Sequence, residues 1–180
     1  QQFSAHGVAF TYAAAAAVSS VWPVQGAAEG GTPLTVHGSG FTAASEALGY
    51  LQCRLNGTVV RGQLASGGEA VGCRSAAVAA GYVSVEVSTN GLDFTSDGAQ
   101  YESVWSVVSG VAPRSGPVTG GTVVTLTGTG LMASGARCRF GASVVPASVD
   151  IEGGHRTLLC VSPAHLMGQV ALEVALNSQQ

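Results

Sequence analysis

The sequence has no lysine and few charged residues of any kind. Its seven cationic side chains are all arginines, and against ten acidic residues they give a formal net charge of −3. From Arg54 to Arg156 the arginines neither cluster in a short run nor alternate with aromatic residues, as they do in nucleic-acid-binding surfaces. The charge pattern therefore predicts that neither DNA nor RNA is a partner.

A long uninterrupted apolar run is also missing. The longest run of small apolar residues covers residues 13–18, far short of the roughly 20 residues that a membrane-spanning helix requires. Its alanines are the only stretch with clear helix propensity, and they are too few to sustain an isolated helix. We therefore expect a linker or the end of a strand here, and no membrane contact by this segment.

Motifs of catalysis and metal binding are absent as well. The sequence has no Gly-x-Ser-x-Gly elbow and no Cys-x-x-Cys pair, and its histidines at positions 6, 37, 155 and 165 lack metal-ligand spacing. Asp93 and Asp97 supply only two carboxylates, whereas a calcium ion takes about six to eight oxygens. The sequence predicts no catalytic residue, no metal site and no cofactor.

What the sequence does contain is glycine and apolar residues. Apolar residues make up 46% of the chain and charged residues only 9%, which is the composition of a packed chain rather than a disordered one. Ten of the 26 glycines lie in a motif that occurs twice. Residues 24–41 read VQGAAEGGTPLTVHGSGF, and residues 111–131 read VAPRSGPVTGGTVVTLTGTGL. The sequence therefore contains an internal repeat of two units.

Each repeat unit alternates apolar and polar residues with a period of two. In the first unit Thr35, Arg54 and Glu86 fall on one face of the expected strands. The opposite, apolar face comprises Leu34, Val36, Leu51, Cys53, Leu55, Val83, Val85 and Val87. Such alternation predicts antiparallel strands with one buried side. Two β-sandwiches of roughly 80 to 90 residues each fit this pattern better than one large domain.

The repeated glycines stand at the ends of one expected strand in each unit. A phosphate-binding loop is the competing interpretation, but it needs a following helix and, in the Walker form, a lysine. We therefore expect tight turns or positive φ angles at these positions. The predicted turn glycines are Gly30, Gly31, Gly38, Gly40, Gly120, Gly121, Gly128 and Gly130.

With these motifs assembled, the sequence resembles the IPT/TIG family of immunoglobulin-like domains. The resemblance rests on the Gly-Gly-Thr phrase with its following Gly-x-Gly, and on three later motifs: Cys-Arg-Phe at 138–140, LLCVSP at 158–163, and VEVSTNG at 85–91. It implies an all-β chain of tandem immunoglobulin-like (E-set) β-sandwiches. The first unit departs from the family pattern at 73–76, where CRSA lacks the expected proline.

The ends of the chain are out of phase with the repeat. The chain begins without a methionine or a leader, and residues 3–12, from Phe3 to Tyr12, align with the segment around Phe94 and Tyr101 that closes the first unit. We expect residues 1–19 to be the last strand of a preceding repeat plus a linker, 20–104 a complete domain, and 105–180 a domain lacking its final strand. Truncation is the simpler explanation, and pairing of residues 3–12 with a neighbouring chain is the alternative.

Four cysteines permit three pairings. The repeat selects Cys53 with Cys73 and Cys138 with Cys160, since each pair then lies inside one unit. Buried free thiols are the remaining alternative, because the spacing does not fit zinc. Disulfides predict an oxidising compartment, and the Asn56-Gly57-Thr58 sequon, a predicted N-glycosylation site, agrees with an extracellular or cell-surface location.

The resemblance implies a non-catalytic extracellular structural or adhesion module, part of a tandem array in a secreted or cell-surface protein such as the fibrocystin-like ectodomains of cilia. Its expected partners are proteins or neighbouring repeats. One alternative is the ligand-binding stalk of a plexin-like receptor. Another is an accessory domain of a polysaccharide-processing enzyme, in which Trp22 or Trp105 stacks on a glycan; packing between domains is the simpler expectation for these two side chains.

Overall fold

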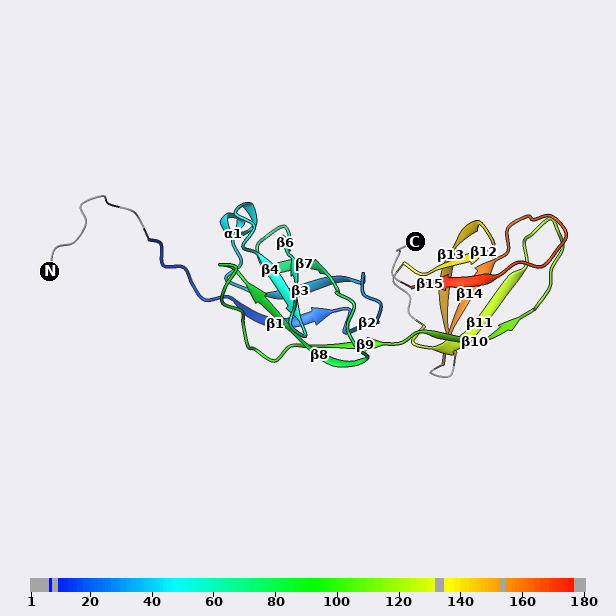
Figure 1. Ribbon diagram of the computed structural model, residues 1–180, viewed down its shortest axis with the longest axis horizontal. Coiled ribbons are helices and arrows are strands. Elements are labelled where there is room, and N and C mark those ends of the chain that lie inside the picture. The colour runs from blue at the N-terminus through cyan, green and yellow to red at the C-terminus, as the bar shows by residue number, and fades with distance from the viewer. Residues whose placement is uncertain (1–6, 8–9, 132–134, 153–154, 177–180) are drawn as a thin grey trace.

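The computed structural model describes residues 7, 10–131, 135–152 and 155–176 of the chain. It consists of β-strands and one short helix, arranged as two β-sandwiches that follow one another along the longest axis (Figure 1). The all-β, tandem-sandwich fold predicted from the repeat is confirmed.

The first sandwich is built from two sheets. One sheet has the order β1 (Ala17–Trp22), β3 (Pro33–Ser39), β7 (Ala70–Arg74) and β6 (Gln63–Leu64). The other has the order β2 (Gln25–Ala27), β9 (Gln100–Val104), β8 (Gly81–Ser88), β4 (Gln52–Leu55) and β5 (Thr58–Arg61). All pairings are antiparallel except that of β2 with β9.

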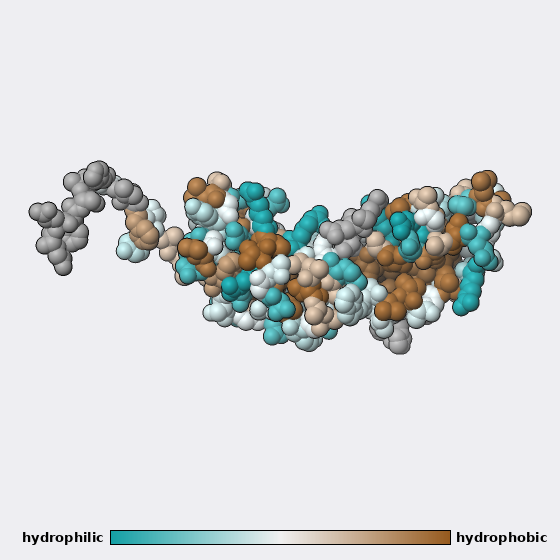
Figure 2. Space-filling model, in the orientation of Figure 1, coloured by the Kyte–Doolittle hydropathy of each residue, from teal (hydrophilic) through white to brown (hydrophobic). Residues whose placement is uncertain are grey.

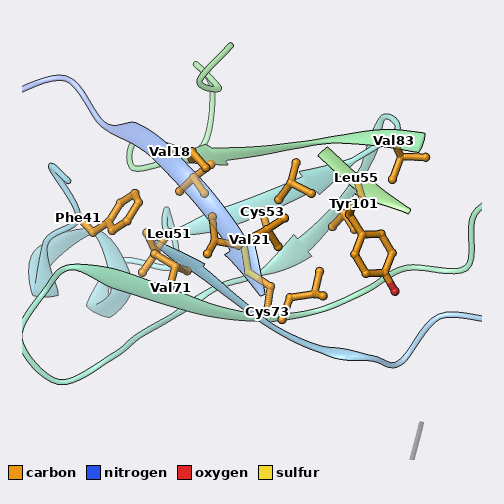
Figure 3. Packing of buried hydrophobic residues seen from close by; sticks show 14 residues of the cluster. Val18, Val21, Phe41, Leu51, Cys53, Leu55, Val71, Cys73, Val83 and Tyr101 are labelled. Carbon is orange, nitrogen blue, oxygen red and sulfur yellow. A yellow bond between two sulfur atoms is a disulfide. The ribbon is translucent and has the colours of Figure 1, made fainter. Parts of the chain in front are cut away.

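The core of the first sandwich lies between these sheets and is made mostly of valine and leucine side chains (Figure 3). Every residue of the apolar face expected from the alternation is buried, whereas Thr35, Arg54 and Glu86 are only partly buried. Tyr101 is the largest fully buried side chain. The period-two pattern therefore identified the inward face of β3, β4 and β8 correctly.

The second sandwich repeats this plan with one continuous run of paired strands. Its order is β10 (Val107–Ala112), β11 (Val123–Thr129), β14 (His155–Val161), β13 (Ser143–Glu152), β12 (Arg137–Phe140) and β15 (Leu172–Ala175). The long strand β13 pairs with β12 through its first part and with β14 through its second. In the first sandwich Gly62 separates the same path into β5 and β6.

The two units share irregularities as well as regular strands. In each, the first strand carries a register shift against its partner, between Val18 and Ser20 in β1 and between Val108 and Gly110 in β10. A bulge in the first strand of both units indicates that the repeat encodes backbone detail and not only burial.

The loop after the second cysteine is also the same in both units. Gly31 N donates to Ser75 O, and Gly121 N donates to Ser162 O. Ala76 replaces the family's proline in the first unit without changing these hydrogen bonds.

Helix α1 (Ala43–Ala47) was not predicted. It lies between β3 and β4 and begins after Thr42, whose side chain accepts a hydrogen bond from Ser45 N. The only helix propensity identified in the sequence was in the alanine run, where residues 13–16 form neither helix nor strand and Ala17 begins β1. Most of residues 3–12 lie outside the described residues.

Six of the eight repeated glycines have φ angles between +66° and +85°, a backbone region that residues other than glycine rarely adopt. Gly38 and Gly128 differ, and the expectation of a turn is wrong for them. Both lie inside strands without a positive φ, where a Cβ would overlap the carbonyl oxygen of Ala17 or Val107. Glycine is required there because the first strand of each unit passes close to the backbone.

We predict that Gly38→Ala destabilises the first sandwich by about 1 to 3 kcal/mol, the usual range for overpacking. Gly72→Ala in β7 is the matched control, since its Cβ would lie 3.7 Å from Gln63 O in ordinary contact and its φ is not positive. Hydrogen exchange in increasing urea measures the unfolding free energy of the first sandwich in both variants. Equal stability of the two variants would contradict the close-approach explanation.

Candidate functional site

A disulfide joins the two sheets at the centre of each sandwich. Cys53 on β4 is bonded to Cys73 on β7, and Cys138 on β12 is bonded to Cys160 on β14. All four cysteines are buried, and Figure 3 shows the first bridge among the core side chains. These are the pairs that the repeat predicts.

Each bridge closes a short loop. The sequence separations are 20 and 22 residues, and cross-links of this span stabilise a domain by about 3 kcal/mol in the chain-entropy model. Such a contribution is large beside the total stability of a small domain. The bridges are therefore structural groups that hold the sheets together, rather than reactive thiols.

The outer face of each sandwich carries the same cross-strand ion pair. Arg54 on β4 pairs with Glu86 on β8, and Arg139 on β12 pairs with Glu173 on β15. In the first unit the Arg54 guanidinium also lies 4.1 Å from the centroid of the Phe94 ring, a cation–π contact.

Asn56 lies at the tip of the hairpin between β4 and β5. Its φ is +44° and that of Gly57 is +85°, as expected for a two-residue hairpin turn rich in Asn and Gly. Asn56, Gly57 and Thr58 are all exposed. The sequon is therefore accessible to a glycosyl-transferring enzyme on a folded or folding chain.

The two aspartates considered as calcium ligands make separate, local contacts. Asp93 accepts a hydrogen bond from the Asn90 side chain at 2.7 Å, and Asp97 accepts one from Val18 N at 2.7 Å. Asp97 thus fastens the loop before β9 to the bulge of β1. Within the described residues no group of three His, Cys, Asp or Glu side chains could hold a metal ion.

A shallow hollow at one end of the first sandwich gathers residue types that a hydrolase uses, which sequence reasoning did not identify. Ser19, His37 and Glu69 line it together with glycines. A nucleophile must be hydrogen-bonded to its base, and the base to an orienting group. Among the described contacts no hydrogen bond joins these three side chains, so the arrangement is not that of a catalytic triad.

Both tryptophans are exposed. Trp22 at the end of β1 is 64% exposed, and Trp105 between β9 and β10 is 59% exposed. The expectation that they are buried by packing between the domains is therefore wrong. Each presents an aromatic surface to solvent.

A model of the IPT/TIG domain matches the chain twice, over residues 16–103 and 106–180. Human fibrocystin-L is a relative that is 30% identical over 169 residues, which cover 91% of this chain and 4% of that protein. Within the described residues no helix is both long and apolar enough to cross a membrane.

Two solved structures of the plexin A4 extracellular region share the fold. Both have a TM-score of 0.68, with 13% and 20% sequence identity, and they cover 90% and 92% of this chain. The chain spans 15% and 17% of those plexin chains, so it corresponds to a small part of each protein that it matches.

We predict that peptide mapping without reduction joins Cys53 to Cys73 and Cys138 to Cys160. Replacing Cys53 and Cys73 by alanine should lower the unfolding free energy of the first sandwich by about 3 kcal/mol and leave the second unchanged. The reciprocal variant of Cys138 and Cys160 is the matched control. A peptide linking one unit to the other, or equal losses in both sandwiches, would contradict the assignment.

We predict that Asn56 carries an N-glycan when the chain passes through a eukaryotic secretory pathway. The measurement is the mass lost on treatment with an N-glycosidase. Thr58→Ala should abolish this loss, and Thr58→Ser should keep it, because the serine hydroxyl also completes the sequon. An unmodified Asn56 in the secreted protein would refute the prediction.

Proposed function

The chain belongs to the IPT/TIG domain family, and from that premise we propose that it is a non-catalytic extracellular module that spaces or holds other groups within a tandem array. Its proposed units are residues 20–104 and 105–180, with residues 1–19 as the last strand of a preceding repeat plus a linker. Protein partners and neighbouring repeats are the proposed contacts.

The observation that carries this proposal is the short connection between two matching sandwiches. β9 ends at Val104 and β10 begins at Val107, so two residues separate the units. Ser106 Oγ donates to Gly130 O at 3.2 Å, and the Trp105 carbonyl oxygen lies so close to Gly130 that an added Cβ would clash with it. The connection is therefore fastened to the second sandwich, which limits how far the spacing between units can vary.

The segment that leads into the first sandwich passes just as close to its turn glycine. The Ala15 carbonyl lies close to Gly40, the residue that corresponds to Gly130 in the repeat. The same close approach at the start of each sandwich supports a series of units with a regular spacing, as a structural array requires.

The location that we propose is the cell surface or the extracellular space. Two buried disulfides and an exposed sequon support it, and the plexin A4 structures that share the fold are of an extracellular region. Adhesion and a ciliary surface are finer parts of the proposal.

A second candidate is an accessory module that binds a glycan. The exposed indoles of Trp22 and Trp105 favour it, because sugar rings stack on aromatic faces. The third candidate, the stalk of a plexin-like receptor, shares the fold but requires a separate head domain.

Reading the coding sequence on both sides of this segment separates the candidates. A structural array predicts further IPT/TIG units next to residues 1 and 180. A receptor stalk predicts a distinct head domain and a membrane anchor, and a glycan-binding accessory predicts a neighbouring catalytic domain. Flanking catalytic sequence without further repeats would overturn the proposal.

A further inference from the structure

One sheet of the first sandwich carries an exposed aromatic side chain beside small residues. The register of β1, β3, β7 and β6 places Trp22 opposite Thr35, Thr35 opposite Gly72, and Gly72 opposite Gln63. The residues next to them along β1, β3 and β7 are buried in the core: Val21, Leu34, Val36, Val71 and Cys73. Because side chains alternate between the two faces of a strand, these four residues lie together on the outer face of the sheet. We call them the Trp22 row.

The Trp22 row forms a low platform across the sheet. Neighbouring strands lie about 4.8 Å apart, so the three steps from Trp22 to Gln63 span roughly 14 Å. Trp22 is 64% exposed at one end of the row. In the middle, a Cβ on Gly72 would have only Gln63 O within 4 Å, at 3.7 Å. The row therefore combines an exposed indole, an open floor and a terminal amide.

A hollow lies on each side of the row. The larger, of about 720 Å³, is lined by Thr35, Gly72 and Gln63 of the row and by Arg74. The smaller, of about 430 Å³, is the hollow that contains His37. Arg74 follows Gly72 by two residues on β7, and His37 follows Thr35 by two residues on β3. Since β3 and β7 are antiparallel, Arg74 and His37 stand on opposite sides of the row, and the face is concave on both sides.

Groups that form hydrogen bonds surround the platform. Arg74 Nη1 donates to Gly31 O at 3.1 Å, which positions the guanidinium and leaves its other N–H groups available. Among the contacts of the described residues, neither the Gln63 amide nor the His37 ring has a hydrogen-bond partner. These side chains offer both donors and acceptors to a ligand that lies on the row.

The formal charges around the row cancel. The larger hollow is lined by Arg61, Arg74 and Glu29, and the smaller by Glu69. A surface that binds an acidic peptide or a sulfated glycan carries an excess of positive charge, which this face lacks. The face therefore fits an uncharged ligand.

The second sandwich does not repeat this arrangement. Its corresponding row is, in the same order, Ala112, Thr125, Leu159 and Ser148. An alanine thus stands in the place of Trp22, and a leucine side chain occupies the floor that Gly72 leaves open. In the view of Figure 2, apolar surface gathers on the second sandwich and is more broken up by hydrophilic residues on the first. The Trp22 row is therefore a property of the first sandwich and not a requirement of the fold.

We propose that the Trp22 row binds a neutral oligosaccharide with β-1,4 linkages. One sugar ring stacks on the Trp22 indole, because the C–H groups on a ring face pack against an aromatic surface. The chain then crosses Thr35 and Gly72 toward Gln63, and its hydroxyls meet the polar groups beside the row. A β-1,4-linked chain is extended and ribbon-like, so it can lie along a sheet face that has no deep pocket.

This inference goes beyond the proposed spacer role, and it locates glycan binding at Trp22 without the use of Trp105. It rests on neither the tandem array nor the sequence that flanks the chain. A negative result would therefore leave the spacer role standing, and flanking sequence that overturned the spacer role would leave this site in place.

Tryptophan fluorescence of a Trp105→Phe variant tests the inference, because Trp22 is then the only tryptophan of the chain. The probes are hexasaccharides of β-1,4-linked glucose, xylose, mannose and N-acetylglucosamine. We expect at least one of them to change the Trp22 emission in a saturable manner. In calorimetric titrations of the otherwise unchanged chain, Trp22→Ala should weaken this binding by at least about tenfold, whereas Trp105→Phe should leave it unchanged.

A second variant, Gly72→Leu, introduces the residue type of the second sandwich. It should block the floor of the row and fold normally, because the φ of Gly72 is not positive and the position is open. Hydrogen exchange in increasing urea checks its folding. Tyr82→Ala is the matched control, since it removes a 71% exposed aromatic ring from the other sheet and should bind like the parent chain.

Three results would overturn the inference. The first is that none of the four hexasaccharides binds. The second is that binding survives in Trp22→Ala or in folded Gly72→Leu, or is lost in Trp105→Phe. The third is that the face binds only a sulfated oligosaccharide or an acidic peptide.

Discussion

The two sheets of each sandwich are held by a sulfur bridge through a core of small side chains, and the rest of the structure depends on this constraint. Valine and leucine dominate both cores, and Tyr101 is the only aromatic side chain among the fully buried residues described. Each such side chain contributes only modest burial. The disulfide between Cys53 and Cys73 fixes the distance between the sheets of the first sandwich at their centre.

Local patterns in the sequence predicted the features that are determined locally. The alternation in β3, β4 and β8 specifies which face is buried, and the repeat fixes which cysteines fall in one unit. The role of Gly38 could not be predicted, because it depends on how closely β1 pairs with β3 at this position. Helix α1 was missed for a similar reason: Glu46 accepts a hydrogen bond from Leu64 N, a contact between distant residues. The exposure of Trp22 and Trp105 depends on how the units meet, which no local pattern records.

The repeat also allows a comparison of the ion pair beneath the Phe94 ring with its counterpart in the second sandwich. The side chains of Arg54 and Glu86 are 35% and 20% exposed beneath Phe94, whereas those of Arg139 and Glu173 are 55% and 53% exposed. Pairs exposed to this extent contribute little stability. The ion pair therefore adds little to the stability of either sandwich, even where the Phe94 ring lies over Arg54.

The strand that leaves the first sandwich is placed to carry load into the second. β9 lies inside its sheet, between β2 and β8, and not at an edge. It continues after two residues into β10, which is paired with β11. Pulling the units apart would shear the ladders of β9 on both sides, with all bonds loaded together, instead of opening them one at a time. The disulfide then keeps the sheets from sliding, because it links β4, two strands from β9, to β7 in the opposite sheet. An exit strand in the sheet interior and a cross-link between the sheets both oppose extension of the first sandwich, which is the property that the proposed spacer role would require.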